Sequence, residues 1–170
     1  TVSRLVKRKG VDIAIRIVHQ LSKKYPSIKY YIAGVGSEKE KLETLVRQLN
    51  AESFILFLGN IDNDAKYNLL TQSDFFLLPN HSAGNSDFEG FGISFIEASL
   101  FGNVIVGGKQ GGAGEAVIDG TTGFLFDFDK PESVEKAVDV VSKYIENPEL
   151  MVSIKQNGIG FVKNNYDWKI

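Results

Sequence analysis

The sequence predicts an α/β protein built on a single Rossmann-like, doubly wound parallel sheet. Segments whose apolar residues recur at helical spacing alternate with short segments that are apolar throughout. A strand that is apolar throughout is typical of a sheet covered on both faces. Regular alternation of strand and helix then favours parallel strands joined by helices. The length of 170 residues fits one domain with one substantial core.

The alternation begins at the first residues. Residues 2–6 are a short apolar run and predict a strand. Apolar residues over Val11–Leu21 have helical spacing and predict a helix. This helix has to end before Pro26, because the residue preceding a proline avoids helical backbone angles. Residues 28–33 and 54–58 predict the next two strands, with a helix between them.

Polar residues mark the starts of two helices in this part of the chain. Ser37 and Glu40 have the spacing of a capping box, which predicts a helix start. Asp62 or Asn63 can cap the next helix. Residues 74–79 then predict a strongly apolar strand that ends in a proline.

The second half continues in the same order. We expect a helix, a strand, a glycine-rich loop, a short strand and two closing helices: 91–101, 104–106, 107–114, 124–126, a helix with Pro131 in its first turn, and a helix from about 148 to 165.

Composition excludes several classes of function. The formal net charge of −2 gives no electrostatic footprint for nucleic acid. Cysteine is absent and there are two histidines, so we expect no disulfide and no metal site. No apolar run is long enough to span a bilayer and no signal peptide opens the chain, so we expect a cytoplasmic protein.

The carboxyl edge of the sheet is the expected ligand site, because doubly wound sheets bind ligands beyond the carboxyl ends of their strands. Arg4 and Lys9 lie at or just past the end of the first predicted strand. Two cations there can neutralise a diphosphate, although a solvated basic loop is the alternative.

The most informative segment runs from Glu89 to Glu97. Gly90 and Gly92 allow backbone N–H groups to approach a ligand closely, and the start of the following helix attracts a phosphate. Glu97 lies inside this helix, and helical side chains lean toward the N-terminus, so its carboxylate can accept hydrogen bonds from sugar hydroxyls. The alternative is that Glu89 caps the helix and Glu97 is a solvated surface residue.

A second glycine run follows the strand at 104–106. Gly111 and Gly112 precede a short helix and can cradle an anion or a sugar through their N–H groups, unless they form an ordinary flexible turn. Acidic pairs at 62–64 and 127–129 resemble metal ligands, but each stands at a predicted helix start, so we expect capping.

Together these segments resemble the C-terminal domain of retaining glycosyltransferases of the GT4 type, which have the GT-B fold. The motifs occur in the order of that family: Arg4 with Lys9-Gly10, Ile32-Ala-Gly34-Val-Gly36, Glu89 to Glu97, Gly111-Gly-Ala-Gly-Glu115, and Asp119-Gly120-Thr-Thr-Gly123 before Phe124-Leu-Phe126.

The resemblance implies a nucleotide-diphosphate sugar as donor, with no cofactor and no metal. Arg4 and Lys9 match the positions that bind the donor diphosphate, and Glu97 matches the residue that bonds the ribose hydroxyls. Glu89, with the backbone of Gly90-Phe91-Gly92, matches the group around the transferred sugar and the distal phosphate. The segment around Gly59-Asn60 is similar to the one that flanks the base.

The resemblance also implies a second domain. Residues 1–170 start inside a predicted strand and end at the opening of another element, so we expect a donor-binding C-terminal domain truncated at both ends. A missing N-terminal domain would bring a glycan, lipid or small-molecule acceptor and could place the full protein at the inner face of a membrane. Where many relatives have proline before the glutamate of the glycine loop, this chain has Gly114, which leaves its sugar preference open.

Two other functions remain compatible with the sequence. One is a nucleotide-sugar epimerase of the same fold, and the other is a non-catalytic nucleotide-binding module. Substitution of Glu89 and Glu97 separates the module from the transferase, because a module would leave sugar transfer by the full-length protein intact.

Overall fold

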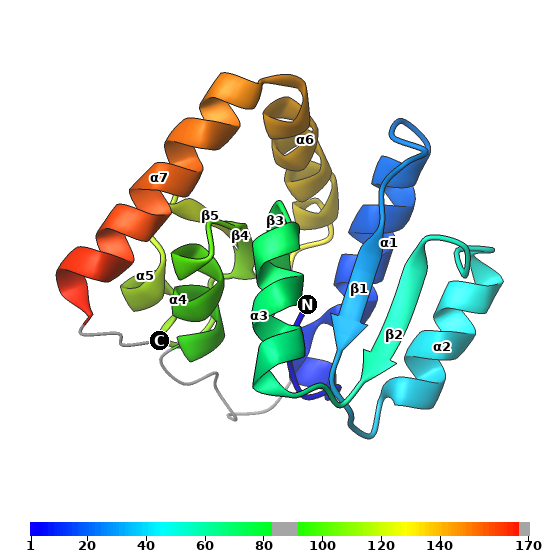
Figure 1. The fold of residues 1–170 in the computed structure, drawn as a ribbon. Coiled ribbons are helices and arrows are strands. Elements are labelled where there is room, and N and C mark those ends of the chain that lie inside the picture. Colours follow the sequence, from blue (N-terminus) through cyan, green and yellow to red (C-terminus); the bar gives the residue numbers. More distant parts are fainter. Residues whose placement is uncertain (83–91, 167–170) are drawn as a thin grey trace.

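The computed structural model describes residues 1–82 and 92–166, which form the α/β architecture that the sequence predicts (Figure 1). In this part of the chain β1 pairs with β2, and β3, β4 and β5 lie side by side. Every one of these pairs is parallel. The strands are β1 (Tyr30–Ala33), β2 (Ile55–Gly59), β3 (Phe75–Leu78), β4 (Val104–Gly108) and β5 (Gly123–Phe126).

The N-terminal segment joins the two groups of strands. Ser3 donates its backbone N–H to Ala33 O at 3.0 Å, and on the other side the Thr1 hydroxyl donates to Leu77 O. The predicted strand at 2–6 is therefore reduced to an isolated parallel bridge between Val2 and Ala33. The resulting order, β2-β1-segment-β3-β4-β5, is that of a doubly wound sheet.

Helices cover the two faces of the sheet as two separate groups. Buried residues of α1, α2 and α6 form one apolar cluster, and those of α3, α4, α5 and α7 form a second. The helices are α1 (Val11–Ser22), α2 (Lys39–Gln48), α3 (Asn63–Gln72), α4 (Ile93–Leu100), α5 (Ala113–Ala116), α6 (Ser133–Glu146) and α7 (Pro148–Asn165).

The central strands contribute to both clusters. Leu77 and Val106 lie in the α1 cluster, whereas Phe76 and Ile105, their neighbours in sequence, lie in the α4 cluster. Alternate residues of a strand point to opposite faces, so β3 and β4 need apolar residues at every position. This is the physical reason for their unbroken apolar runs.

The outer strands depart from this pattern. Tyr31, Leu56 and Leu58 are between 37 and 39% exposed, while their neighbours Tyr30 and Ile55 are buried. The prediction of a sheet covered on both faces is therefore confirmed for β3 and β4 and wrong for one face of β1 and β2.

One predicted cap forms and another does not. The Asp62 carboxylate accepts a hydrogen bond from Ala65 N–H at 2.8 Å and caps α3 as predicted. The capping box of Ser37 and Glu40 is wrong, because α2 has Glu38 at its N-cap and no side-chain cap hydrogen bond there.

Two boundaries also move. Pro131 lies before the N-cap Glu132 of α6 rather than in the first turn. Gly107 and Gly108, predicted as loop, end strand β4. An alanine at Gly108 would place its Cβ 1.7 Å from Asn80 O, so glycine lets the two chain segments approach each other.

Phe95 holds α4 against the sheet, and its removal is expected to destabilise the fold. Its side chain is fully buried and meets Phe76 edge to face with ring centroids 6.2 Å apart. Phe95→Ala should lower the free energy of unfolding by about 3–5 kcal/mol, as for other buried aromatic truncations. Ile93→Ala is the matched control, because Ile93 is in the same helix but 56% exposed. Urea unfolding measures both, and equal losses for the two variants would contradict this packing.

Candidate functional site

The segments singled out by the sequence meet at one edge of the sheet. In Figure 1 the arrowheads of β1 and β2 point to the edge at which α3 and α4 begin, and the N-terminal segment passes along the same edge. Its 3₁₀ helix, η1 (Lys7–Lys9), lies there. This is the carboxyl edge, where a doubly wound sheet binds its ligands.

Gly10 fixes η1 against the end of β3. It has a left-handed backbone (φ 62°), and its N–H donates to Lys7 O at 3.0 Å. A Cβ at Gly10 would lie 2.0 Å from the carbonyl oxygen of Pro79, so only glycine fits. Lys9, the residue before it, is 8% exposed, whereas Arg4 is exposed. The two predicted cations thus stand at the expected edge in different environments.

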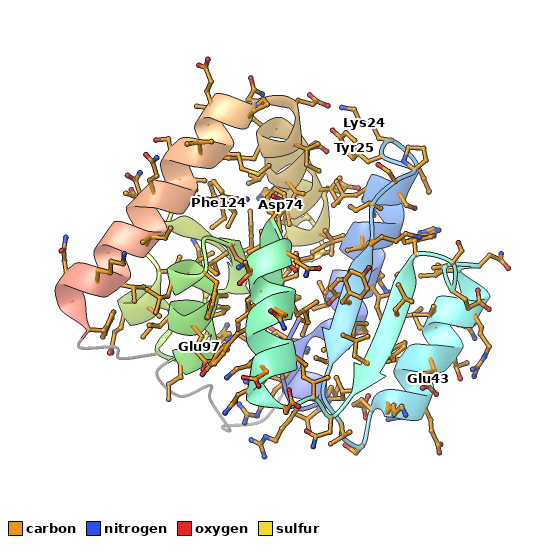
Figure 2. The ribbon with its side chains drawn as sticks, in the orientation of Figure 1. Lys24, Tyr25, Glu43, Asp74, Glu97 and Phe124 are labelled. Carbon is orange, nitrogen blue, oxygen red and sulfur yellow. The ribbon has the colours of Figure 1, made fainter. Side chains whose placement is uncertain are left out.

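Glu97 lies on α4, on the side of the helix that faces this edge (Figure 2). Helix α4 follows Gly92, which is its N-cap in a left-handed conformation (φ 81°). The Glu97 carboxylate accepts a hydrogen bond from Lys66 Nζ on α3 at 2.8 Å. Their side chains are 20% and 17% exposed. Glu97 is therefore not the freely solvated residue of the alternative interpretation.

The second glycine run also reaches this edge. Gly111 has a left-handed backbone (φ 68°), and Gly112 is the N-cap of the four-residue helix α5. Asn80 ties this run to the end of β3. Its buried side chain accepts from Gly108 N–H and donates to Gln110 O, both at 3.1 Å. The loops after β3 and β4 are thus joined directly.

The loop after β2 carries the residues predicted near the base. Gly59 closes β2 with a left-handed backbone (φ 67°), and its carbonyl accepts from Gly34 N–H at 2.7 Å. Asn60 follows it and is exposed, ahead of the cap of α3. Both residues therefore lie at the carboxyl end of β2.

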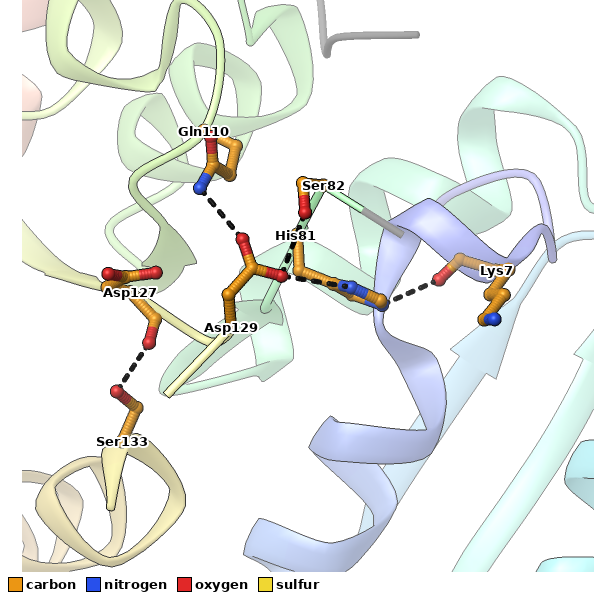
Figure 3. Close-up of polar contacts among 7 residues, drawn as sticks. All are labelled: Lys7, His81, Ser82, Gln110, Asp127, Asp129 and Ser133. Carbon is orange, nitrogen blue, oxygen red and sulfur yellow. Dashed lines mark hydrogen bonds and ion pairs between the residues drawn. The ribbon is translucent and has the colours of Figure 1, made fainter. Parts of the chain in front are cut away.

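Asp129 connects the loops on the other side of the edge (Figure 3). Its carboxylate accepts from Ser82 Oγ and from Gln110 Nε2, each at 3.0 Å, and lies 3.7 Å from His81 Nδ1. The other ring nitrogen of His81 is 3.1 Å from Lys7 O. The network therefore links η1 to the loops that follow β3, β4 and β5.

The sequence profile of a family described as "Glycosyl transferases group 1" matches residues 1–161. The chain belongs to the group 1 glycosyltransferase family. The GT4-type resemblance inferred from the motifs is thereby confirmed.

A relative within this family is a GDP-mannose-dependent α-(1-6)-phosphatidylinositol monomannoside mannosyltransferase of Mycolicibacterium smegmatis. It is 30% identical over 168 residues, which are 98% of this chain and 43% of the relative. The chain thus spans less than half of that mannosyltransferase.

Solved structures confirm the predicted fold. The C-terminal domain of the group 1 glycosyltransferase LpcC from Francisella tularensis has a TM-score of 0.83 and 26% identity, covering 98% of this chain and 84% of that domain. HepE of Anabaena, in complex with UDP-glucose, has a TM-score of 0.82 and 25% identity, covering 98% of this chain and 43% of HepE. The chain therefore has the fold of a C-terminal domain of the group 1 glycosyltransferase family.

Three predicted residues of this family's glycine segment, Glu89, Gly90 and Phe91, lie outside the described residues. The remaining predicted residues belong to the N-terminal segment with η1, the end of β2, the start and middle of α4, and the loop before α5: Arg4, Lys9, Gly59, Asn60, Gly92, Glu97, Gly111 and Gly112. Their roles toward a ligand stay predictions.

The described residues were also compared with the requirements of a metal site and of a membrane-spanning helix. Within 1–82 and 92–166, no three or more histidine, aspartate or glutamate side chains gather as a metal-binding group. Of the helices in the same ranges, none combines the length and the apolar composition that a bilayer span requires.

A large cavity is lined by none of the predicted donor-site residues that the structure describes. Its volume is about 970 Å³, and its lining includes Thr1, Tyr25, Ile28, Asp74 and Asn103. Asp74 and Asn103 immediately precede β3 and β4, and Ile28 lies two residues before β1, so this part of the lining is at the amino edge of the sheet. Its size makes this cavity a candidate ligand site. The cations and the glycine loops favour the carboxyl edge as the site of the donor.

Sequence reasoning did not identify Lys66 or the role of Asp129. Asp129 was expected to cap a helix, but the N-cap of α6 is Glu132, and Asp129 bonds residues in other loops instead. Lys66 pairs with a residue 31 positions away. Lys66 and Asp129 both bond residues that are distant in sequence, so no local motif predicts either contact.

Proposed function

We propose that the chain binds the nucleotide-diphosphate sugar donor of a group 1 glycosyltransferase at the carboxyl edge of its sheet. The observation that carries this proposal is the placement at one edge of Arg4, buried Lys9, the start of α4 and the glycine run before α5. Family membership favours sugar transfer over the epimerase and the binding module.

The arrangement suits the chemistry of a departing diphosphate. Cleavage of the sugar–phosphate bond builds negative charge on the leaving group. Arg4, Lys9 and the N-terminus of α4 offer fixed positive charge and N–H donors for it. Stabilisation is most effective where the charge develops, which is in the transition state. We infer that transfer proceeds with retention of configuration and needs neither a metal nor a cofactor.

The acceptor belongs to the proposal as well. A glycan, a lipid or a small molecule would be held by an N-terminal domain across the cleft, and any attachment of the full protein to a membrane would come from that domain. The chain by itself is expected to bind nucleoside diphosphates and to transfer sugar weakly or not at all. Robust transfer by the purified chain would contradict this division of roles.

Binding of nucleoside diphosphates is the direct test. UDP, GDP and ADP are compared with uridine, guanosine and adenosine by thermal unfolding of the chain. A diphosphate present at about 100 times its dissociation constant should stabilise the fold by roughly 2.7 kcal/mol, and the matching nucleoside far less. If none of the three diphosphates raises the melting temperature, the proposed function is wrong.

A further inference from the structure

The Lys66–Glu97 pair joins two helices at the carboxyl edge. Lys66 is in the first half of α3, and Glu97 is in α4. Lys66 Nζ donates to Glu97 Oε1 at 2.8 Å. A second contact joins the same two helices next to the ion pair. The ring of Tyr67, in α3, stacks on Phe101, at the end of α4, with ring centroids 5.2 Å apart. The backbones that carry the pair are therefore held by an apolar contact beside it.

Only one oxygen of the Glu97 carboxylate is engaged by the described part of the chain. The bond from Lys66 goes to Oε1, and no described residue binds Oε2. A carboxylate has about four acceptor sites, and the side chain keeps 20% of its surface exposed. Glu97 thus offers acceptor positions on a side chain whose orientation is already set.

We propose that Lys66 is a positioning residue that orients Glu97 to accept hydrogen bonds from the vicinal hydroxyls of a ribose. A ligand diol pairs best with an acceptor that does not have to be ordered on binding. This inference rests on the proposed function, and it adds that the chain selects ribonucleotides over 2′-deoxyribonucleotides through a lysine outside the known motifs of the sequence.

The competing interpretation is that the ion pair only fastens α3 to α4. Ion pairs with substantial exposure contribute little to stability, and these two side chains are mostly covered. Both interpretations predict a loss of stability when Lys66 is replaced. They differ in the ligand, because only a positioning role links Lys66 to the 2′-hydroxyl.

The test measures the preference for ribose in matched variants. Dissociation constants of UDP, GDP and ADP, and of their 2′-deoxy counterparts, are determined by calorimetry for the wild type and for Lys66→Met, which keeps the aliphatic stem. We expect Lys66→Met to weaken the ribonucleotide that binds by about three- to tenfold, on the scale of one hydrogen bond. Its 2′-deoxy counterpart should be weakened by a smaller factor, because it has one of the two hydroxyls that Glu97 binds.

Two further variants control the comparison. Lys39→Met removes the lysine of an exposed ion pair on α2 with Glu43 and should leave both dissociation constants unchanged. In a Glu97→Gln background, Lys66→Met should have no additional effect on the ribose preference, because residues that act as one unit are not additive. If Lys66→Met does not fold, Lys66→Leu, which also removes the donor and the charge, provides the same comparison.

The possible outcomes separate the two proposals. If the wild type binds UDP, GDP or ADP but Lys66→Met weakens the ribonucleotide and its 2′-deoxy form by the same factor, Lys66 only fastens the helices and this inference is wrong. If the wild type binds none of the three, the proposed function fails, and the inference fails with it.

Discussion

Replacing Lys9 by methionine is expected to weaken binding of a nucleoside diphosphate by about 10- to 150-fold. The side chain is 8% exposed and sits in η1, at the edge where we place the diphosphate. A hydrogen bond to a charged group contributes about 1.5–3 kcal/mol, and each 1.4 kcal/mol corresponds to about a factor of ten in affinity. Methionine has a similar length and no charge, so the change removes the cation and keeps most of the volume. Isothermal titration calorimetry measures the effect.

The nucleoside provides the internal comparison. It carries no phosphate, so its affinity for Lys9→Met should equal that for the wild type. Arg4→Ala should show the same contrast. Lys7→Met is the matched control, because Lys7 is in the same 3₁₀ helix but exposed, where screening by salt leaves an effect of about twofold or less. An equal loss of nucleoside and diphosphate affinity in Lys9→Met would contradict a role for Lys9 at the phosphates.

Replacing Gly10 by alanine is expected to disrupt the fold around η1 more than any change on the helix surfaces. The backbone is left-handed there, which costs a residue with a Cβ about 1–2 kcal/mol. The new methyl would also lie 2.0 Å from Pro79 O, and overpacking adds about 1–3 kcal/mol. The sum is a loss of about 2–5 kcal/mol in the free energy of unfolding, which urea titration measures. Since Lys9 precedes Gly10, diphosphate binding should weaken in any folded fraction.

Gly160→Ala is the control, because it should not lower the free energy of unfolding. Gly160 lies inside α7, and a Cβ there would meet no atom within 4 Å. Alanine is the better helix former by about 1 kcal/mol, so this variant should be as stable as the wild type or more stable. A Gly10→Ala chain with wild-type stability would show that η1 does not press against the end of β3.

The arrangement of strands and helices was predictable because local pattern and tertiary structure agree. Residues 75–78 and 104–106 are apolar throughout because both of their faces are buried. The edge carrying Arg4, Lys9 and Glu97 followed from the same pattern, since the carboxyl ends of parallel strands share one side of a sheet. The spacing of apolar residues and the direction of the strands were therefore enough to predict the order of the elements and the edge that carries the candidate site.

The errors arise where several local solutions compete or where partners are distant in sequence. Ser37 and Glu40 have capping-box spacing, but the helix begins one residue later than that motif requires, with Glu38 as its N-cap. Leu56 and Leu58 are apolar yet exposed, so an apolar residue in a strand does not by itself predict a covered face. The links of Lys66 to Glu97 and of Asp129 to Ser82 span 31 and 47 positions. Pairs of this kind depend on how the chain folds, so no local sequence motif predicts them.

The crystal structure of this chain with bound UDP or GDP is the most direct measurement. We expect the diphosphate within hydrogen-bonding distance of Lys9 and Arg4, and the ribose hydroxyls beside Glu97. A nucleotide found instead in the cavity at the amino edge, between Tyr25, Ile28 and Asp74, would contradict the assignment of the donor to the carboxyl edge.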